Sequence, residues 1–236
     1  MTSTNPFQHV RFFQGLDGAA LTVVQQKSYV RRVSDESFFF QQDEPATTFY
    51  VLTAGQAHLS QVTIDGQQVI LGFLGPDQEV GIVAAIQHAE YPLSLQAVTD
   101  CVALAWDAPT LQSLMENYPI LALRALRMVT GRFVQLQQQY RELATERVER
   151  RIARVLLRLS AQAGQPHPTG VRIEFPLSRQ DVAEMTGTTL YTVSRTLSQW
   201  EKLGIVTTGR ELIIIRSPQE LLAIADNILP DKLTDP

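Results

Sequence analysis

The chain has 236 residues, of which 44% are hydrophobic and 19% charged, and its formal net charge is −4. This length fits one large domain or two ordinary ones, and the apolar content is too high for a disordered protein. No segment has the roughly 18 consecutive apolar residues that a membrane helix needs. The N-terminus lacks the pattern of a secretion signal, and the single cysteine, Cys101, cannot form an intrachain disulfide. We therefore expect a cytoplasmic protein without membrane attachment.

The charges are unevenly distributed along the chain. Residues 1–145 carry 8 Lys and Arg against 13 Asp and Glu, a balance of −5. Residues 146–217 carry 11 against 7, a balance of +4, and the last 19 residues carry 1 against 4. A basic segment inside an acidic protein is typical of a chain in which one domain meets phosphate groups and another does not.

The region from about residue 12 to residue 106 consists of short apolar runs separated by turn residues. Runs at 49–52, 57–62 and 68–71 have the length of strands, and Asp65-Gly66 between the last two is a strong hairpin signal. Recurring glycines predict an all-β barrel or jelly roll. We expect short helices at 17–26 and 108–117, and Cys101 buried at the end of a strand.

From residue 122 the apolar pattern changes to that of a long helix. Apolar residues are separated alternately by four and three positions over about three heptads, the a/d pattern of helices that pair along their length. They are Ala122, Leu126, Val129, Phe133, Leu136, Tyr140 and Leu143. The pattern favours a homodimer, and the alternative is an ordinary amphipathic helix that packs on its own barrel.

Residues 178–198 carry the strongest signal in the chain, that of two short helices joined by a tight turn. Ser178 and Asp181 have the spacing of a capping box, which begins a helix. Gly187 permits the left-handed turn that ends it, and Thr188 or Thr189 can cap a second helix over 190–198. Ala183 and Val193 have the size and position to form the core between the two helices.

The helix pair is flanked by segments that extend the same domain. An amphipathic helix over 148–159 precedes it, followed by an exposed loop at 164–170 that is rich in Gly and Pro. After the pair, apolar runs at 205–206 and 212–215, with Gly209 in a turn between them, predict a β-wing.

The order of barrel, long helix and winged helix-turn-helix resembles that of the Crp/Fnr regulators. The most specific match is LSRQDVAEMTGTTLYTVSRTLSQWEKLGIV at 177–206, and ERVERRIARVLLRL at 146–159 resembles the family's first helix after the hinge. The barrel turns at Gly55, Asp65-Gly66, Asp77 and Gly81 look like the family's sensor-domain turns. The resemblance implies an α+β fold with a cyclic-nucleotide-binding-like sensor domain at 1–118 and a dimerisation helix at 119–145. It also implies a DNA-binding domain at 146–218 and a tail at 219–236.

The resemblance also implies which residues meet double-stranded DNA, since in such folds the second helix enters the major groove. The base-facing positions are Leu190, Tyr191, Ser194 and Arg195. The phosphate-facing positions are Ser178, Arg179, Gln180, Thr189 and Thr192, with Arg210 added from the wing. The family usually has Glu at the position of Tyr191, so we expect an atypical half-site.

The sensor domain departs from the cyclic-nucleotide-binding members of the family. Those members present Gly-Glu and Arg-Ser or Arg-Thr, whereas this chain has Gly81-Ile82 and Tyr91-Pro92. Without the Glu and the Arg, the ribose and the phosphate have no partners, so we do not expect cyclic AMP to bind. One cysteine cannot hold an iron–sulfur cluster, which usually takes four thiolates.

The effector is therefore unidentified, and we place its pocket at Gly81, Ile82, Val83, His88 and Tyr91. Apolar residues beside His88 could accept a haem that senses nitric oxide or carbon monoxide, with His9 and His58 as weaker ligands. The same residues could equally form a plain core with His88 on a surface loop. An unliganded regulator is a further alternative.

We expect a transcription regulator and no enzyme, because the sequence contains no catalytic triad, metal-ligand or phosphate-loop pattern. His167 and its Pro-rich loop fall where activators of the family touch RNA polymerase, which favours activation over repression. The alternative from another class is a barrel-type ligand-binding module that acts through protein–protein contacts.

Overall fold

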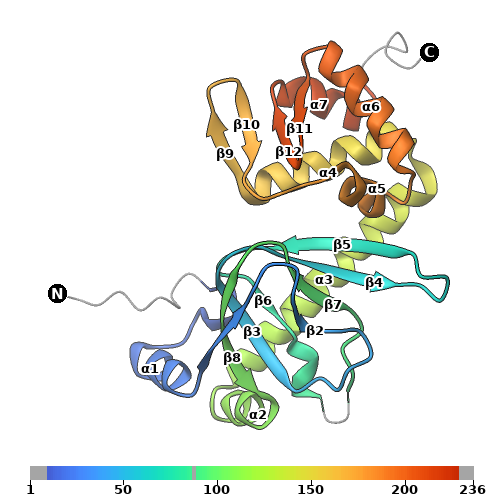
Figure 1. Ribbon diagram of the computed structural model, residues 1–236. Coiled ribbons are helices and arrows are strands. Elements are labelled where there is room, and N and C mark those ends of the chain that lie inside the picture. The colour runs from blue at the N-terminus through green and yellow to red at the C-terminus, as the bar shows by residue number, and fades with distance from the viewer. Residues whose placement is uncertain (1–9, 87–88, 229–236) are drawn as a thin grey trace. The chain divides into compact units, whose positions relative to one another are not determined.

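A computed structural model describes residues 10–86 and 89–228. It has the predicted fold class, with a β-sandwich, a long helix and a winged helix-turn-helix in chain order (Figure 1). The chain divides into two compact parts, and the main boundary lies within the long helix between Leu136 and Gln137, with residues 68–70 also grouped with the second part. Of the helices within the described residues, none combines the length and the hydropathy needed to cross a membrane.

Two four-stranded sheets form the N-terminal part. One sheet has the order β1-β8-β3-β6 and the other the order β2-β7-β4-β5, and every register that the structure gives in them is antiparallel. The predicted hairpin is present, because β4 and β5 are neighbours and Gly66 between them has a φ of 77°. The strands are β1 (Tyr29–Val33), β2 (Phe38–Phe40), β3 (Thr48–Ala54), β4 (Ala57–Val62), β5 (Gln68–Leu74), β6 (Glu79–Val80), β7 (Ser94–Ala97) and β8 (Cys101–Asp107).

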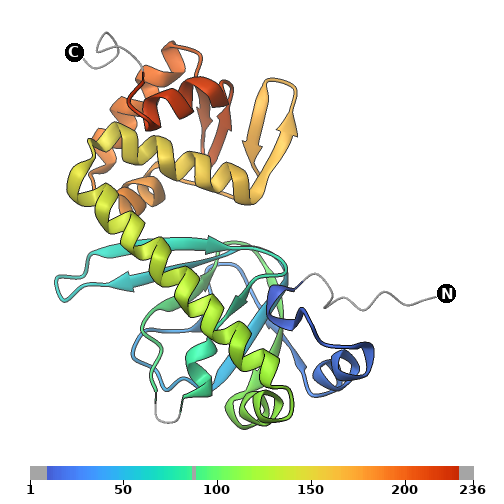
Figure 2. The same ribbon diagram turned by 180° about the vertical axis from the view of Figure 1, so that it is seen from behind.

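The two faces of the first sheet belong to different apolar cores. Side chains alternate along a strand, so Tyr50 and Leu52 of β3 contribute to the core between the sheets, whereas Phe49 and Val51 contribute to the core outside them. The outer core is covered by η2 (Arg11–Phe13), α1 (Gly18–Gln26), α2 (Ala108–Asn117) and the first two turns of α3 (Pro119–Thr145) (Figure 2). Asp17 and Asp107 cap α1 and α2, so both predicted helices are confirmed.

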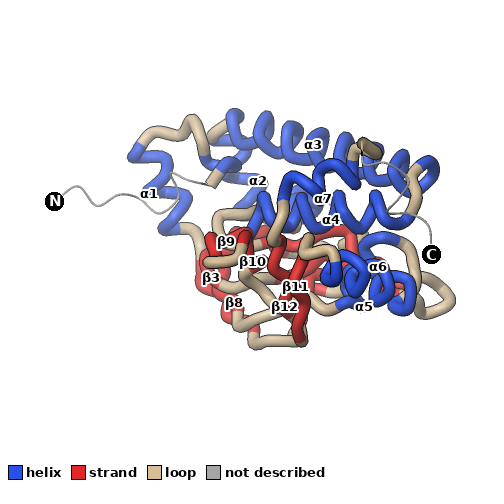
Figure 3. Tube along the Cα trace, turned by 90° about the horizontal axis from the view of Figure 1, so that it is seen from above, coloured by secondary structure: helices blue, strands red, loops and turns tan. Residues whose placement is uncertain are grey.

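The C-terminal part packs helices against a third four-stranded sheet, of order β11-β12-β10-β9 (Figure 3). Helix α4 (Val148–Ala163) is amphipathic, as predicted, and buries Ile152, Val155, Leu156 and Leu159. The other helices are α5 (Arg179–Thr186), α6 (Leu190–Lys202) and α7 (Pro218–Ala225). The strands are β9 (Gly164–His167), β10 (Gly170–Ile173), β11 (Val206–Gly209) and β12 (Leu212–Ile215).

Three details differ from the sequence-based expectations. Residues 164–170, predicted as a loop, include β9 and the turn to β10, because β10 pairs with β12 and β9 adds an edge where Pro166 is tolerated. Gly209 is the last residue of β11 and pairs with Leu212, so the wing turn consists of Arg210 and Glu211. Helix α7 lies in the predicted tail and packs on α4, so folded structure continues to at least Ala225.

Candidate DNA-binding interface and sensor pocket

The ends of α5 and α6 are set by local capping interactions, as the sequence predicts. The Ser178 Oγ accepts from the Asp181 N–H at 3.1 Å, and the Asp181 carboxylate accepts from the Ser178 N–H at 2.7 Å. Gly187 ends α5 in the left-handed conformation with a φ of 60°. Of the two predicted caps for α6, Thr189 is the one used, since its Oγ1 accepts from the Thr192 N–H at 3.2 Å.

One face of each helix is buried in a shared core. Val182 and Ala183 of α5 are buried, as are Val193, Leu197 and Trp200 of α6. Ala183 is buried, as its position predicts, and its small side chain is compatible with a close approach of the two helices. The end of α5 is also tied to α4, because the Arg151 Nε donates to the Thr186 carbonyl at 3.0 Å. The buried face and this hydrogen bond fix how the helix pair packs, and the opposite face of α6 is left for a partner.

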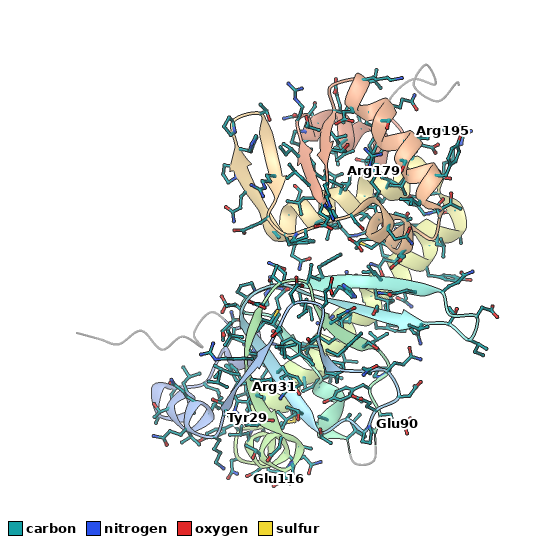
Figure 4. The ribbon with its side chains drawn as sticks, in the orientation of Figure 1. Tyr29, Arg31, Glu90, Glu116, Arg179 and Arg195 are labelled. Atoms are coloured by element: carbon teal, nitrogen blue, oxygen red, sulfur yellow. The ribbon has the colours of Figure 1, made fainter. Side chains whose placement is uncertain are left out.

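The four predicted base-facing residues lie on the exposed side of α6. Leu190 is 47% exposed and Tyr191 76% exposed, and both are in the first turn of the helix. Arg195 is exposed and projects from α6 (Figure 4). Ser194 is partly exposed. This arrangement makes all four side chains accessible to a partner, and their contact with base edges stays a prediction.

The predicted phosphate-facing residues differ in how they are held. Arg179 donates from Nη2 to the Thr208 Oγ1 at 2.8 Å, and Gln180 donates from Nε2 to the Glu184 Oε1 at 2.9 Å. Burial raises the pKa of the Glu184 carboxyl. Ser178, Thr189 and Thr192 are engaged in the caps, with the two threonine hydroxyls 3.0 Å apart. Arg210 is exposed in the wing turn.

Sequence reasoning missed the residues that hold Arg179. Thr208 lies in the wing and contacts Glu201, which lies in the last turn of α6. These two residues are 29 and 22 positions from Arg179, so no local spacing pattern relates them to it.

A cluster of charged residues joins the end of α3 to α4 and was also missed. The Glu142 side chain is buried, and it accepts from the Gln138 Nε2 at 2.9 Å and from the Arg158 Nη1 at 2.8 Å. Glu146 accepts from Arg150 and Arg154. A buried carboxylate needs such partners, because an unpaired charge in an apolar surrounding is costly.

In the sensor domain, the predicted pocket residues that the structure describes are divided between two apolar cores. Val83 and Tyr91 belong to the core between the sheets, whereas Ile82 packs against the outer core, and both Ile82 and Val83 lie in η3 (Ile82–Ala85). Gly81 has a φ of 83°, and a Cβ atom there would lie 2.6 Å from the Thr48 carbonyl oxygen. His88 and the weaker candidate His9 lie outside the described residues. His58 lies on β4 with its ring 5.9 Å from that of Phe73.

The Tyr91 side chain makes a ring contact and two hydrogen bonds inside the sandwich. Its ring stacks on Phe40 with 3.8 Å between the centroids. Its hydroxyl donates to the Thr48 carbonyl at 2.7 Å and accepts from the Thr48 N–H at 2.9 Å. Burial raises the pKa of Tyr91, so the phenol is neutral. A position where cyclic-nucleotide-binding relatives are expected to carry a cation therefore holds a neutral internal phenol.

Arg132 of α3 was not singled out by the sequence. Its Nη2 donates to the Glu79 carbonyl at 3.1 Å, two residues before Gly81. Burial lowers the pKa of Arg132 and raises that of the Glu79 carboxyl. This contact ties α3 to the strand that leads into η3, within the N-terminal part of the chain.

Comparisons with known proteins agree with this architecture. The model of the Crp-like helix-turn-helix domain matches residues 150–224, and that of the cyclic nucleotide-binding domain matches residues 30–118. A global nitrogen regulator of Synechocystis is 27% identical over 188 residues, covering 79% of this chain and 83% of the relative. The transcriptional activator protein anr of Pseudomonas aeruginosa is 26% identical over 196 residues, covering 83% and 80%.

Solved structures share the fold over most of the chain. FixK2 from Bradyrhizobium japonicum is similar with a TM-score of 0.73 and 23% identity, covering 84% of this chain and 96% of its own. The global regulator CLP of Xanthomonas campestris has the same TM-score at 22% identity. Both domain models match in the expected order, and the similar proteins are regulators rather than enzymes. This chain therefore belongs to the Crp/Fnr family of DNA-binding transcription regulators.

Proposed function

We propose that the protein works as a homodimer that reads a palindromic operator, with the α6 helix of each subunit in one half-site. One observation carries this proposal: α3 exposes an apolar stripe along its length. Leu126, Val129, Phe133, Leu136 and Tyr140 are between 47% and 75% exposed. Such a run of large apolar side chains is costly to leave in water and marks an interaction surface.

The opposite face of α3 argues against the alternative that the stripe packs on its own barrel. Leu121 of that face is buried, Ala125 packs against the outer core, and Met128 and Arg132 are partly buried. The helix therefore already uses one face for its own domain, and the stripe lies on another. A second copy of α3 is the natural occupant, because the alternating spacing of four and three residues is that of paired helices.

Symmetry then sets the form of the operator. A two-fold dimer with one helix-turn-helix in each subunit matches an inverted repeat whose half-sites are about one helical turn apart. The two domain matches support the proposed division into a sensor domain, a dimerisation helix and a DNA-binding domain. A cytoplasmic location fits a DNA-binding protein.

We further propose that the protein activates more than it represses, through contact between RNA polymerase and the β9–β10 hairpin. The hairpin is an exposed projection at the sheet edge, with Pro166, Pro168 and Thr169 exposed. The name of the P. aeruginosa relative, a transcriptional activator, agrees with this direction.

The effector is proposed to be a small molecule other than cyclic AMP. A relative in Mycobacterium tuberculosis is named as cAMP-activated, at 21% identity. In this chain Ile82 and Tyr91 replace the acceptor and the cation, and Tyr91 is held by Thr48. The haem alternative depends on His88. The visible spectrum of the purified protein tests it, because a Soret band would establish haem and its absence would direct attention to organic effectors.

Sedimentation and DNA selection test the main proposal together. We expect the wild-type protein to sediment as a dimer and to select inverted repeats from a randomised DNA pool. Phe133→Glu should produce monomers and weaken operator binding, because it places a charge in the stripe. Gln135→Glu is the matched control, since it adds the same charge at an exposed position of α3 outside the stripe. Monomeric wild-type protein, or selection of single half-sites, would contradict the proposal.

A further inference from the structure

Three polar residues from three different elements form a hydrogen-bonded chain beside the helix-turn-helix. Arg179 is the first residue of α5, Thr208 lies in wing strand β11, and Glu201 lies in the last turn of α6. The Arg179 Nη2 lies 2.8 Å from the Thr208 Oγ1. That hydroxyl lies 3.3 Å from each Glu201 carboxylate oxygen, and the Thr208 N–H donates to the Glu201 Oε1 at 2.7 Å.

The direction of this chain is fixed by which atoms carry hydrogen. A guanidinium can only donate, and an ionised carboxylate can only accept. The Thr208 hydroxyl therefore accepts from Arg179 and donates its single proton to Glu201. The 2.7 Å bond from the Thr208 N–H to the carboxylate fixes the wing residue, so the hydroxyl is presented to Arg179 from a held position.

The arrangement leaves Arg179 available for another partner. Within the described part of the chain, no ion pair within 4.0 Å joins the Arg179 guanidinium to a carboxylate. Its charge is thus not neutralised by direct contact, and one of its five N–H donors is used by Thr208. Arg179, Glu201 and Thr208 are all partly buried, which restricts the movement of the long arginine side chain. The hydrogen bond to Thr208 and the partial burial therefore limit the positions that the guanidinium can take without a ligand.

We propose that Glu201 and Thr208 are positioning residues that orient Arg179 toward a DNA phosphate. The inference rests on the proposed function, in which Arg179 contacts the DNA backbone. A long side chain loses rotamer freedom when it binds, and a side chain that is already held loses less. Neither positioning residue needs to touch DNA, and Glu201, as an anion, would repel it.

Removing Glu201 has two possible effects on DNA affinity, and they have opposite signs. Loss of its negative charge would strengthen binding, whereas loss of its hold on Arg179 would weaken it. Glu201→Ala removes a negative charge, so simple electrostatics predicts tighter binding to any DNA. Our proposal predicts binding that is weaker by roughly fivefold to tenfold at moderate salt. It also predicts a slope of log K against log salt that is smaller by about one, as if one phosphate contact were lost. Glu220→Ala is the control, because it removes the same charge from an exposed position of α7. This variant should bind DNA as tightly as wild type or slightly more tightly, with an unchanged salt slope.

Variants of Thr208 separate the hydroxyl from the fold of the wing. Thr208→Val keeps the shape and the backbone N–H but removes the hydroxyl, and it should reproduce the loss in affinity and in slope. Thr208→Ser retains the hydroxyl and should restore both. Thermal unfolding of each variant checks that the domain is folded, and binding is compared only between variants with equal unfolding midpoints.

The decisive measurement uses Arg179→Ala as a second background, with fluorescence anisotropy of a labelled random-sequence duplex over a range of salt. If Glu201 and Thr208 act through Arg179, then Glu201→Ala and Thr208→Val should change binding by no more than about twofold in that background. An undiminished effect there, or Glu201→Ala protein that binds as tightly as wild type, would overturn the inference. The proposed function fails separately, through a wild-type protein that does not prefer its selected operator to the random duplex.

Discussion

Leu143, near the end of α3, lies against Gly187, in the turn between α5 and α6: a Cβ atom on Gly187 would lie 3.1 Å from the Leu143 Cδ1. The last residue of the apolar stripe thus faces the turn of the DNA-reading motif within the C-terminal part of the chain. Gly187 also has a φ of 60°, a conformation that other residues adopt only at a cost. Backbone conformation and the Leu143 contact both favour glycine at this position.

Gly187→Ala should therefore destabilise the protein by about 1–2 kcal/mol, from the left-handed conformation and the tight contact together. Chemical denaturation monitored by circular dichroism measures this change. Gly131→Ala is the control, because Gly131 lies inside α3 with open space around it. Alanine there should stabilise the helix by about 0.5–1 kcal/mol. Equal effects of the two substitutions would refute the role assigned to the Gly187 turn.

Arg195→Ala should weaken specific operator binding by roughly 1–3 kcal/mol and relax discrimination at one base pair, because a guanidinium fork on guanine is the commonest specific contact. Competition between operators with single base changes measures it. Arg172→Ala removes the same charge from an exposed position of β10 and should leave the base preference unchanged. An unaltered footprint and base preference for Arg195→Ala would remove Arg195 from the base-reading set.

Tyr191→Glu should change the base selected at one position of each half-site toward a pair with cytosine, because a carboxylate accepts from the cytosine amino group and a phenol does not do so equivalently. Selection from a randomised pool detects the change. Tyr191→Phe keeps the ring and removes the hydroxyl, so it should keep the wild-type preference if the ring makes the contact. Identical selections from wild-type and Tyr191→Glu protein would mean that this side chain does not reach the bases.

The Cys101 thiol should react slowly with thiol reagents in the native protein. Burial, and after it the charges of Asp100 and Asp35, raise the pKa of this thiol to about 11. The reactive thiolate is then about a hundredfold scarcer at pH 8 than for an ordinary cysteine, and its fraction should rise as the pH approaches 11. The rate of disulfide exchange with a chromogenic reagent measures this. Denatured protein is the control and should react at the ordinary rate, whereas rapid reaction of native protein would contradict the burial.

Features that depend on neighbouring residues could be predicted from the sequence. The capping box of Ser178 and Asp181 spans three residues, and the turn at Gly187 depends on one residue's conformational freedom, so both ends of α5 were predictable. The hairpin at Gly66 and the caps at Asp17 and Asp107 follow the same rule. The apolar stripe of α3 could be predicted because the spacing of residues along a helix decides which side chains share a face.

Features that depend on distant residues were decided by the tertiary structure. Composition predicted a loop at residues 164–170, but pairing of β10 with β12 makes it a hairpin. Thr48, 43 residues from Tyr91 along the chain, holds the Tyr91 hydroxyl with two hydrogen bonds, and no local pattern predicted this contact. Nothing in the sequence distinguishes Glu142 from other charged residues. The fold brings the Arg158 Nη1 to 2.8 Å from its carboxylate.

The sequence by itself thus determined the order of the domains and the face of α6 that is presented, because caps, turns and helical periodicity act within one or two turns of the chain. Only the tertiary structure decided what Arg179 is bonded to. Thr208 and Glu201 reach it from a strand and a helix that pack together once the domain has folded, and no spacing along the chain encodes a hydrogen bond made by that packing.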